Sequence, residues 1–130
     1  MIAEARSQGY RRLVPLFAFD DQGKFQELAE KYQIAPLAPR PKARLYYANE
    51  GYGLVKYQSD RFGFRNRDDL WNDKTADIVL IGDSFTFGAC VEEKNSIAGY
   101  LTAADHKVLN LATPGNGPIH YAAIAKVFLP

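Results

Sequence analysis

The aliphatic run at residues 78–81 constrains the fold of this chain more than any other feature. It reads Ile-Val-Leu-Ile without a polar break, as is typical of a strand buried on both faces of a mostly parallel sheet. Residues 108–112 read as a second buried strand. Between them, Asn95 or Ser96 can cap a helix, because apolar residues follow at helical spacing. A further helix is expected over residues 119–128, so the order strand, helix, strand, helix predicts a βαβ unit in an α/β fold.

The chain before this unit divides into two segments. Residues 1–42 form an N-terminal segment with a weak strand at 13–19, a short amphipathic helix from Lys24 towards Tyr32, and an irregular Pro-rich linker over 36–42. Residues 43–75 are expected to form a hairpin, with strands at 44–48 and 54–58 around a glycine-containing turn, followed by an aromatic and basic loop. Residues 76–130 then carry the βαβ unit, and we treat them as the third segment.

Composition excludes several classes of protein. The 130 residues are 47% hydrophobic and 24% charged, and 16 basic against 15 acidic residues leave a net charge of +1. With charges so nearly balanced, the chain has no overall electrostatic field that would attract nucleic acid or an anionic membrane. Cys90 is the single cysteine, and the only histidines are His106 and His120. We therefore predict no internal disulfide, no zinc site and no cofactor.

The N-terminal residues say little about location. Residues 1–6 lack the order of a signal peptide, and no stretch approaches the roughly 18 apolar residues of a membrane span. The sequence predicts a soluble chain whose compartment stays open. A cell-envelope or periplasmic location is compatible with a longer parent protein, with any membrane association through segments absent from this chain.

Ser84 has the placement of a nucleophile. It follows the buried strand at 78–81 directly, so its hydroxyl is expected at the rim of the sheet, where the chemistry of such folds takes place. A serine needs a base and donors for the oxyanion that forms at an acyl carbon. The backbone N–H of Ser84 is one candidate donor. Gly115 ends the next strand, where a missing side chain lets a substrate oxygen approach, so its N–H is the second.

Two segments of the sequence resemble the SGNH (GDSL-like) hydrolases. Residues 77–86, Asp-Ile-Val-Leu-Ile-Gly-Asp-Ser-Phe-Thr, are similar to the first conserved block of that superfamily, and residues 110–116, Asn-Leu-Ala-Thr-Pro-Gly-Asn, are similar to the second. Residues 57–71 also resemble the region before the serine block in a bacterial envelope-associated branch. The resemblance implies a three-layer α/β/α flavodoxin-like fold, here incomplete and with an N-terminal α+β extension. It also implies an esterase or O-acetyl esterase with Ser84 as nucleophile and Gly115 as oxyanion donor.

The remaining blocks of the superfamily are not found. Its Gly-x-Asn-Asp asparagine and its Asp-x-x-His pair have no counterpart, since Ala103 and Gly117 precede His106 and His120 by three residues. Neither histidine is therefore assigned as the base. We expect the first half of a hydrolase domain, inactive by itself, from a parent that acts on small-molecule or carbohydrate esters.

Other interpretations of single features stay open. The aromatic-rich residues 46–71 could belong to a non-catalytic carbohydrate-binding or interaction module. Nucleotide binding at residues 82–88 is weaker, because the P-loop lysine is absent. RNA binding by residues 59–67 is disfavoured, since Asp60, Asp68 and Asp69 neutralise the arginines and the aromatic rings are expected to dock on the core. Five further residues are expected to have structural roles. Asp83 should brace its loop through hydrogen bonds to nearby backbone, Cys90 should be a small core residue, and Trp71 should anchor its loop on the core. His106 is expected in a solvated turn, and His120 at the start of a helix.

Overall fold

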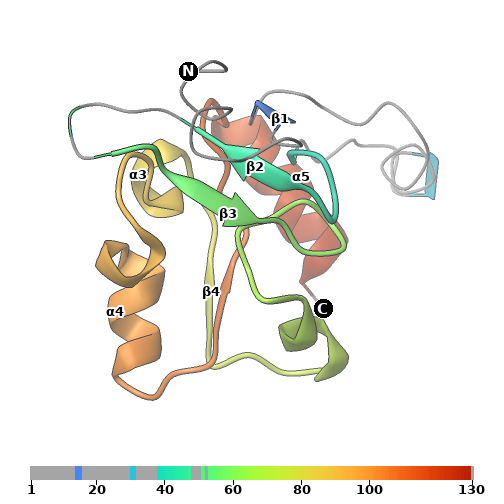
Figure 1. The fold of residues 1–130 in the computed structure, drawn as a ribbon. Coiled ribbons are helices and arrows are strands. Elements are labelled where there is room, and N and C mark those ends of the chain that lie inside the picture. Colours follow the sequence, from blue (N-terminus) through green and yellow to red (C-terminus); the bar gives the residue numbers. More distant parts are fainter. Residues whose placement is uncertain (1–13, 16–29, 32–37, 48–50, 52, 130) are drawn as a thin grey trace.

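The computed structural model describes residues 14–15, 30–31, 38–47, 51 and 53–129, which form a small mixed α/β structure (Figure 1). In chain order its elements are β1 Val14–Pro15, β2 Arg44–Tyr46, β3 Lys56–Gln58, the 3-10 helix η1 Asp68–Asn72, β4 Ile78–Leu80, α3 Ser84–Phe87, the 3-10 helix η2 Glu93–Asn95, α4 Ile97–Ala103, β5 Val108–Asn110 and α5 Pro118–Phe128. Most of the predicted strand at 13–19 and of the helix from Lys24 lies outside the described residues, although residues 30–31 are helical.

The predicted parallel strand pair is confirmed. β4 and β5 pair in parallel, with Ile78 opposite Val108 and Leu80 opposite Asn110. Both strands are shorter than predicted, but their hydrogen bonding continues, since Leu111 N–H donates to Leu80 O at 2.7 Å. Figure 1 shows α4 on one side of this pair and α5 on the other. The pair thus forms a central layer whose carboxyl ends point towards α3.

The predicted hairpin is also confirmed, and it lies over the carboxyl ends of β4 and β5. β2 and β3 pair antiparallel, with Leu45 opposite Tyr57, and β1 adds to β2 in parallel. Leu45 and Tyr57 pack in one buried cluster with Phe87 of α3 and Ala112 after β5. The hairpin is therefore bound to the end of the sheet where Ser84 was predicted.

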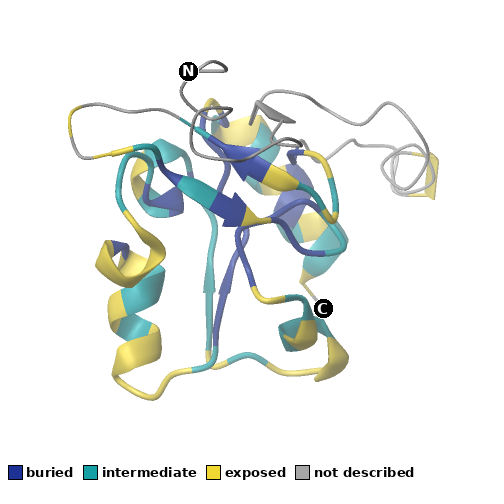
Figure 2. Ribbon diagram, in the orientation of Figure 1, coloured by how far each residue is buried: buried dark blue, intermediate teal, exposed yellow. Residues whose placement is uncertain are grey.

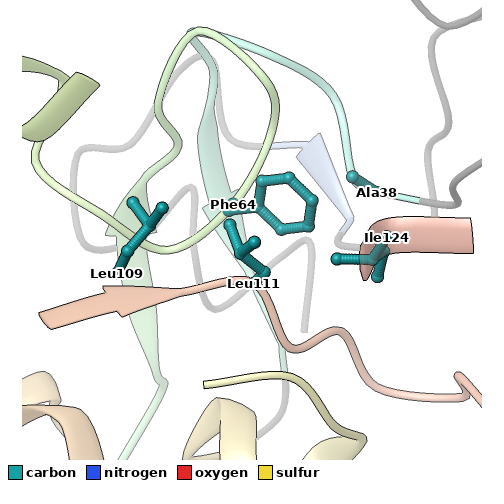
Figure 3. Close-up of a cluster of buried hydrophobic side chains, with 5 residues drawn as sticks. All are labelled: Ala38, Phe64, Leu109, Leu111 and Ile124. Atoms are coloured by element: carbon teal, nitrogen blue, oxygen red, sulfur yellow. The ribbon is translucent and has the colours of Figure 1, made fainter. Parts of the chain in front are cut away.

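A second cluster joins β5 to α5 and to the loop after the hairpin. Figure 3 shows its buried members, with Leu109 and Leu111 facing Phe64 and Ile124, and Ala38 closing one side. Phe62, Trp71 and Phe128 pack against it with ring centroids 4.6 to 5.6 Å apart. Figure 2 accordingly shows β5 buried and the outer face of α4 exposed. The burial of such apolar side chains is the main source of stability in a small domain.

Asp60 organises the loop between the hairpin and η1. Its buried carboxylate accepts hydrogen bonds of 2.7 to 2.9 Å from the backbone N–H groups of Phe62 and Phe64, from Asn66 Nδ2 and from Trp71 Nε1. Burial raises the pKa of Asp60, while the four donated bonds oppose that shift. Four donors on one carboxylate fix the loop in a single conformation.

Asn66 connects this loop to the sheet. Its Nδ2 donates to Asn110 O at 3.0 Å, and Asn110 N–H donates to Asn66 Oδ1 at 2.8 Å. Both Asn110 groups lie on the edge of β5 that faces away from β4, as the register of the pair requires. The Asn66 amide therefore satisfies a strand edge in the way that a neighbouring peptide would.

The expectation that this loop docks on the core is confirmed, but its charges are arranged differently from the sequence interpretation. Arg61 pairs with Asp68 and Arg67 pairs with Asp69 on the surface. Asp60 neutralises no arginine within ion-pair distance and instead accepts the four bonds above. Arg65 is only 4% exposed. Within the described residues, the loop therefore has one buried arginine and two arginines that are paired with aspartates.

Candidate functional site

The chain turns sharply between β4 and α3, and this turn places Ser84 on the first turn of a helix. Asp83 caps α3 by accepting a hydrogen bond from Phe85 N–H at 3.0 Å, which confirms the expected bracing role of Asp83. Phe87 N–H donates to Asp83 O at 2.9 Å, and Gly88 ends the helix at φ 75°. The Ser84 side chain is consequently half-buried at the carboxyl end of β4.

Close packing fixes this helix against the sheet. A Cβ atom on Gly82 would lie 2.2 Å from Thr86 Oγ1, so only glycine fits between β4 and α3. Asn110 Nδ2 donates to Thr86 O at 3.3 Å, and Asn110 Oδ1 accepts from Ala112 N–H at 3.0 Å. One buried amide therefore ties the serine-bearing helix to the exit of β5.

Gly115 follows the second strand in a matching position. Thr113 N–H donates to Gly82 O at 3.2 Å, so the two strand exits are hydrogen-bonded to each other. Ser84 and Gly115 each lie two residues beyond this bonded pair. Gly115 is exposed at φ 85°, in a turn that Asn116 N–H closes on Thr113 O at 3.2 Å. The structure thus brings the two predicted site residues to neighbouring loops.

Three donor groups of these two residues have no hydrogen-bond acceptor inside the described part of the chain, although Ser84 O accepts a bond from Ala89 N–H at 2.9 Å. No bond there involves the Ser84 hydroxyl, the Ser84 N–H or the Gly115 N–H. Backbone N–H groups at the start of a helix and in a tight turn are suited to bind a negatively charged oxygen. The arrangement can therefore present a hydroxyl nucleophile beside two candidate oxyanion donors.

Neither histidine is placed as a base for Ser84. His106 is exposed just before β5, at the opposite end of the parallel pair from Ser84, in accordance with the expected solvated turn. His120 Nδ1 accepts a hydrogen bond from Gly117 N–H at 3.0 Å and so caps α5, in accordance with the expected structural role. The described residues hold no histidine that is hydrogen-bonded to Ser84.

A pocket of about 360 Å³ adjoins Ser84, and we call it the Ser84 pocket. Its lining combines apolar and polar side chains: Tyr47, Ser84, Phe85, Gly88, Ala89, Cys90, Val91, Asn95, Ser96 and Ile97. An outer pocket of about 640 Å³ lies next to it and shares Cys90, Val91 and Asn95 with it. Both volumes are in the range of ligand sites in proteins. The segment 88–91 is therefore a wall of the space beside the serine.

Sequence reasoning missed most of this pocket. Cys90 was expected in the core, but it is half-buried at φ 65° and faces both pockets. Tyr47 was assigned only to a hairpin strand, and Ile97 only to the apolar pattern of a helix, although Ile97 is half exposed. The only signal in the sequence is the Gly88-Ala89 pair, which marks a helix end close to the serine.

Comparisons with known proteins provide no relative for this chain. No protein-family model, no curated protein and no solved structure matches it. Within the residues described, no helix combines the length and the apolar character required to span a membrane, and no three His, Cys, Asp or Glu side chains gather as a metal site would need. The functional argument therefore depends on the geometry around Ser84.

Proposed function

We propose that this chain carries the nucleophile segment of a serine hydrolase that acts on ester bonds. The observation that carries the proposal is the hydrogen bond between Gly82 O and Thr113 N–H, which joins the loop of Ser84 to the loop of Gly115. A hydroxyl at the start of a helix and a glycine N–H on the adjacent strand exit are the kinds of group that acyl transfer uses as nucleophile and oxyanion donor, which supports the proposal.

The proposal includes the SGNH type of hydrolase and its three-layer fold. A parallel strand pair between two helices is the arrangement from which such a fold would be built, and Ser84 and Gly115 follow the two strands in the order that the resemblance implies. The packing of Gly82 on Thr86 explains why glycine precedes the Asp-Ser pair in this chain.

In the proposed reaction, Ser84 Oγ attacks the acyl carbon of the ester while a base accepts the hydroxyl proton. The carbonyl oxygen becomes an oxyanion that the N–H groups of Ser84 and Gly115 stabilise. Collapse of the intermediate breaks the bond to the alcohol, which leaves with the proton. Water then releases the acyl group from Ser84 as a carboxylic acid by the same route in reverse.

The proposal places the base outside the described residues. Loss of a general base lowers the rate by about 10²- to 10⁴-fold. The isolated chain is therefore expected to hydrolyse esters slowly, and the function belongs to the complete product of the coding frame.

The test is covalent labelling of Ser84 in that complete product. A fluorophosphonate reagent should attach to Ser84, as located by peptide mass spectrometry, and hydrolysis of p-nitrophenyl acetate should disappear in Ser84→Ala. Ser59→Ala is the matched control for the assignment, because the Ser59 hydroxyl is buried and bonded to Arg40 O at 2.6 Å, away from the pocket residues. Full activity in Ser84→Ala would reject the proposal.

The other interpretations receive less support. A carbohydrate-binding platform needs exposed rings, whereas the described rings of residues 46–71 are either buried, as in Tyr46, Tyr57 and Phe64, or only partly exposed, as in Tyr47, Phe62 and Trp71. A nucleotide site at residues 82–88 lacks the lysine of a P-loop, and the Phe85 N–H that could contact a phosphate is already bonded to Asp83. The ester hydrolase is therefore the single function that we propose.

A further inference from the structure

Arg65 is a buried cation whose hydrogen bonds go only to the main chain. Its guanidinium donates to Gly88 O at 2.9 Å and to Val91 O at 3.1 Å. Among the described residues, no acidic side chain lies within 4.0 Å of the guanidinium, and Arg65 Nε has no hydrogen-bond acceptor. A buried charge without a counter-charge is costly, and an apolar side chain of similar size would fill the same space at lower cost.

The two carbonyl groups that Arg65 binds are the ends of the segment 88–91. All four residues of this segment line the Ser84 pocket, and the last two also line the outer pocket. Gly88 also lies close against Ser96, since a Cβ atom at Gly88, which has φ 75°, would be 2.5 Å from Ser96 Cβ. Arg65 is therefore hydrogen-bonded to both ends of the segment, and one end is closely packed as well.

The guanidinium also connects this segment to the elements around the serine. It lies over the Tyr57 ring of β3 at 5.7 Å and over the Phe87 ring of α3 at 5.4 Å, and these two rings pack edge to face at 5.5 Å. Cation–π contacts of this kind hold a guanidinium in one orientation. Arg65 thus sets the position of the pocket wall relative to the helix that bears Ser84.

From these contacts we infer that Arg65 is a positioning residue for substrate binding, which holds the segment 88–91 as the wall of the Ser84 pocket. The inference rests on the proposed function, since it assigns the Ser84 pocket to the substrate of that reaction. Arg65 touches neither Ser84 nor the Gly82–Thr113 bond in the described structure, so it acts on the bound substrate through the wall. Its removal should weaken binding more than it slows the chemical step.

The experiment compares Arg65→Met and Arg65→Lys with Arg67→Met. Methionine keeps an unbranched apolar stem, shorter than arginine, without the donors, whereas a lysine ammonium keeps the charge and can reach one carbonyl group. Arg67 is the matched control, because it is an exposed arginine two residues away whose partner is Asp69. In the complete protein, Arg65→Met should raise KM for p-nitrophenyl butyrate about tenfold with kcat changed less than about threefold. Arg65→Lys should be intermediate, and Arg67→Met should match the wild type.

A second readout follows the wall without catalysis. Cys90 is the single cysteine and belongs to the segment that Arg65 holds, so the rate of its reaction with a maleimide reports the position of the wall. The rate in Arg65→Met should differ from wild type by about tenfold or more, because two charged hydrogen bonds are lost. The exposed control Arg67→Met should leave the rate unchanged. If Arg65→Met does not fold, Arg65→Lys gives both readouts.

The outcomes separate the two proposals. A raised KM with preserved kcat and an altered Cys90 rate support the positioning role. An unchanged Cys90 rate, or a fall in kcat without a change in KM, overturns it. If Ser84→Ala keeps full activity, the proposed function fails and the catalytic part of the inference falls with it, and the Cys90 rate then decides whether Arg65 holds the segment.

Discussion

Replacing Asn66 by alanine should strongly reduce the stability of this structure. The change deletes three hydrogen bonds, to Asp60 Oδ2, to Asn110 O and from Asn110 N–H. Asp60 keeps its other three donors, but both main-chain groups of Asn110 stay buried without a partner. Each of these two unsatisfied buried groups costs about 1 to 3 kcal/mol, so the free energy of unfolding should fall by about 2 to 6 kcal/mol. That is a large part of the 5 to 15 kcal/mol of a typical domain.

Urea unfolding measures this change directly. Trp71 is the single tryptophan and donates to Asp60, so its fluorescence reports on the same loop. With a slope of about 2 kcal/mol per molar urea, a loss of about 4 kcal/mol lowers the midpoint by about 2 M. Asn95→Ala is the control, because Asn95 is an exposed amide, and it should stay within about 0.5 kcal/mol of wild type. A loss below about 1 kcal/mol for Asn66→Ala would refute the reasoning.

Three further predictions concern single groups. Gly82→Ala brings a Cβ atom to 2.2 Å from Thr86 Oγ1, so the free energy of unfolding should fall by about 1 to 3 kcal/mol in urea, and an unchanged midpoint would contradict the packing described. Gly115→Ala places a side chain on a residue with φ 85°, so the free energy of unfolding should fall by about 1 to 2 kcal/mol in the same assay, and the rate of fluorophosphonate labelling should also fall. An unchanged free energy of unfolding would contradict the strain, and an unchanged labelling rate would contradict the oxyanion role. Burial raises the pKa of Asp60, so the folded state binds this proton more tightly and the resulting stability, fully present below about pH 4, is lost as the pH rises through the folded pKa. Asp60→Asn does not titrate, so its deficit in unfolding free energy should narrow between pH 4 and pH 7, and a widening deficit would mean that the four donors outweigh burial.

The elements that sequence patterns predicted are those whose signals are local. The run at 78–81 gave β4, and the cap at Ser96 with apolar residues at helical spacing gave α4, whose Ser96 Oγ accepts from Gly99 N–H at 3.1 Å. Periodicity and caps depend on neighbours within four positions, so one sequence suffices to detect them. β4 and β5 are shorter than predicted, because apolar residues continue along the sequence after the regular pairing of the two strands has ended.

The contacts that shape the candidate site have no such local signal. Arg65 and Asn66 were assigned only to an aromatic and basic loop that docks on the core, with no partners named, and these partners lie 23 to 44 positions later in the chain. These partners are main-chain carbonyl and N–H groups, which every residue carries, so no side-chain pattern marks them. The Ser84 pocket likewise draws residues from the hairpin, α3, η2 and α4, and only the fold brings these elements together.

The bond pair between Asn66 and Asn110 makes the two edges of the small parallel sheet unequal. On the β5 side an amide already occupies the positions that a further strand would need. On the β4 side the register turns the main-chain groups of Val79 and Ile81 away from β5, so that edge keeps the pattern that another strand recognises. An additional strand would therefore have to displace the Asn66 amide in order to pair with β5 at Asn110, whereas the described residues show no comparable side-chain bond to the main chain of Val79 or Ile81.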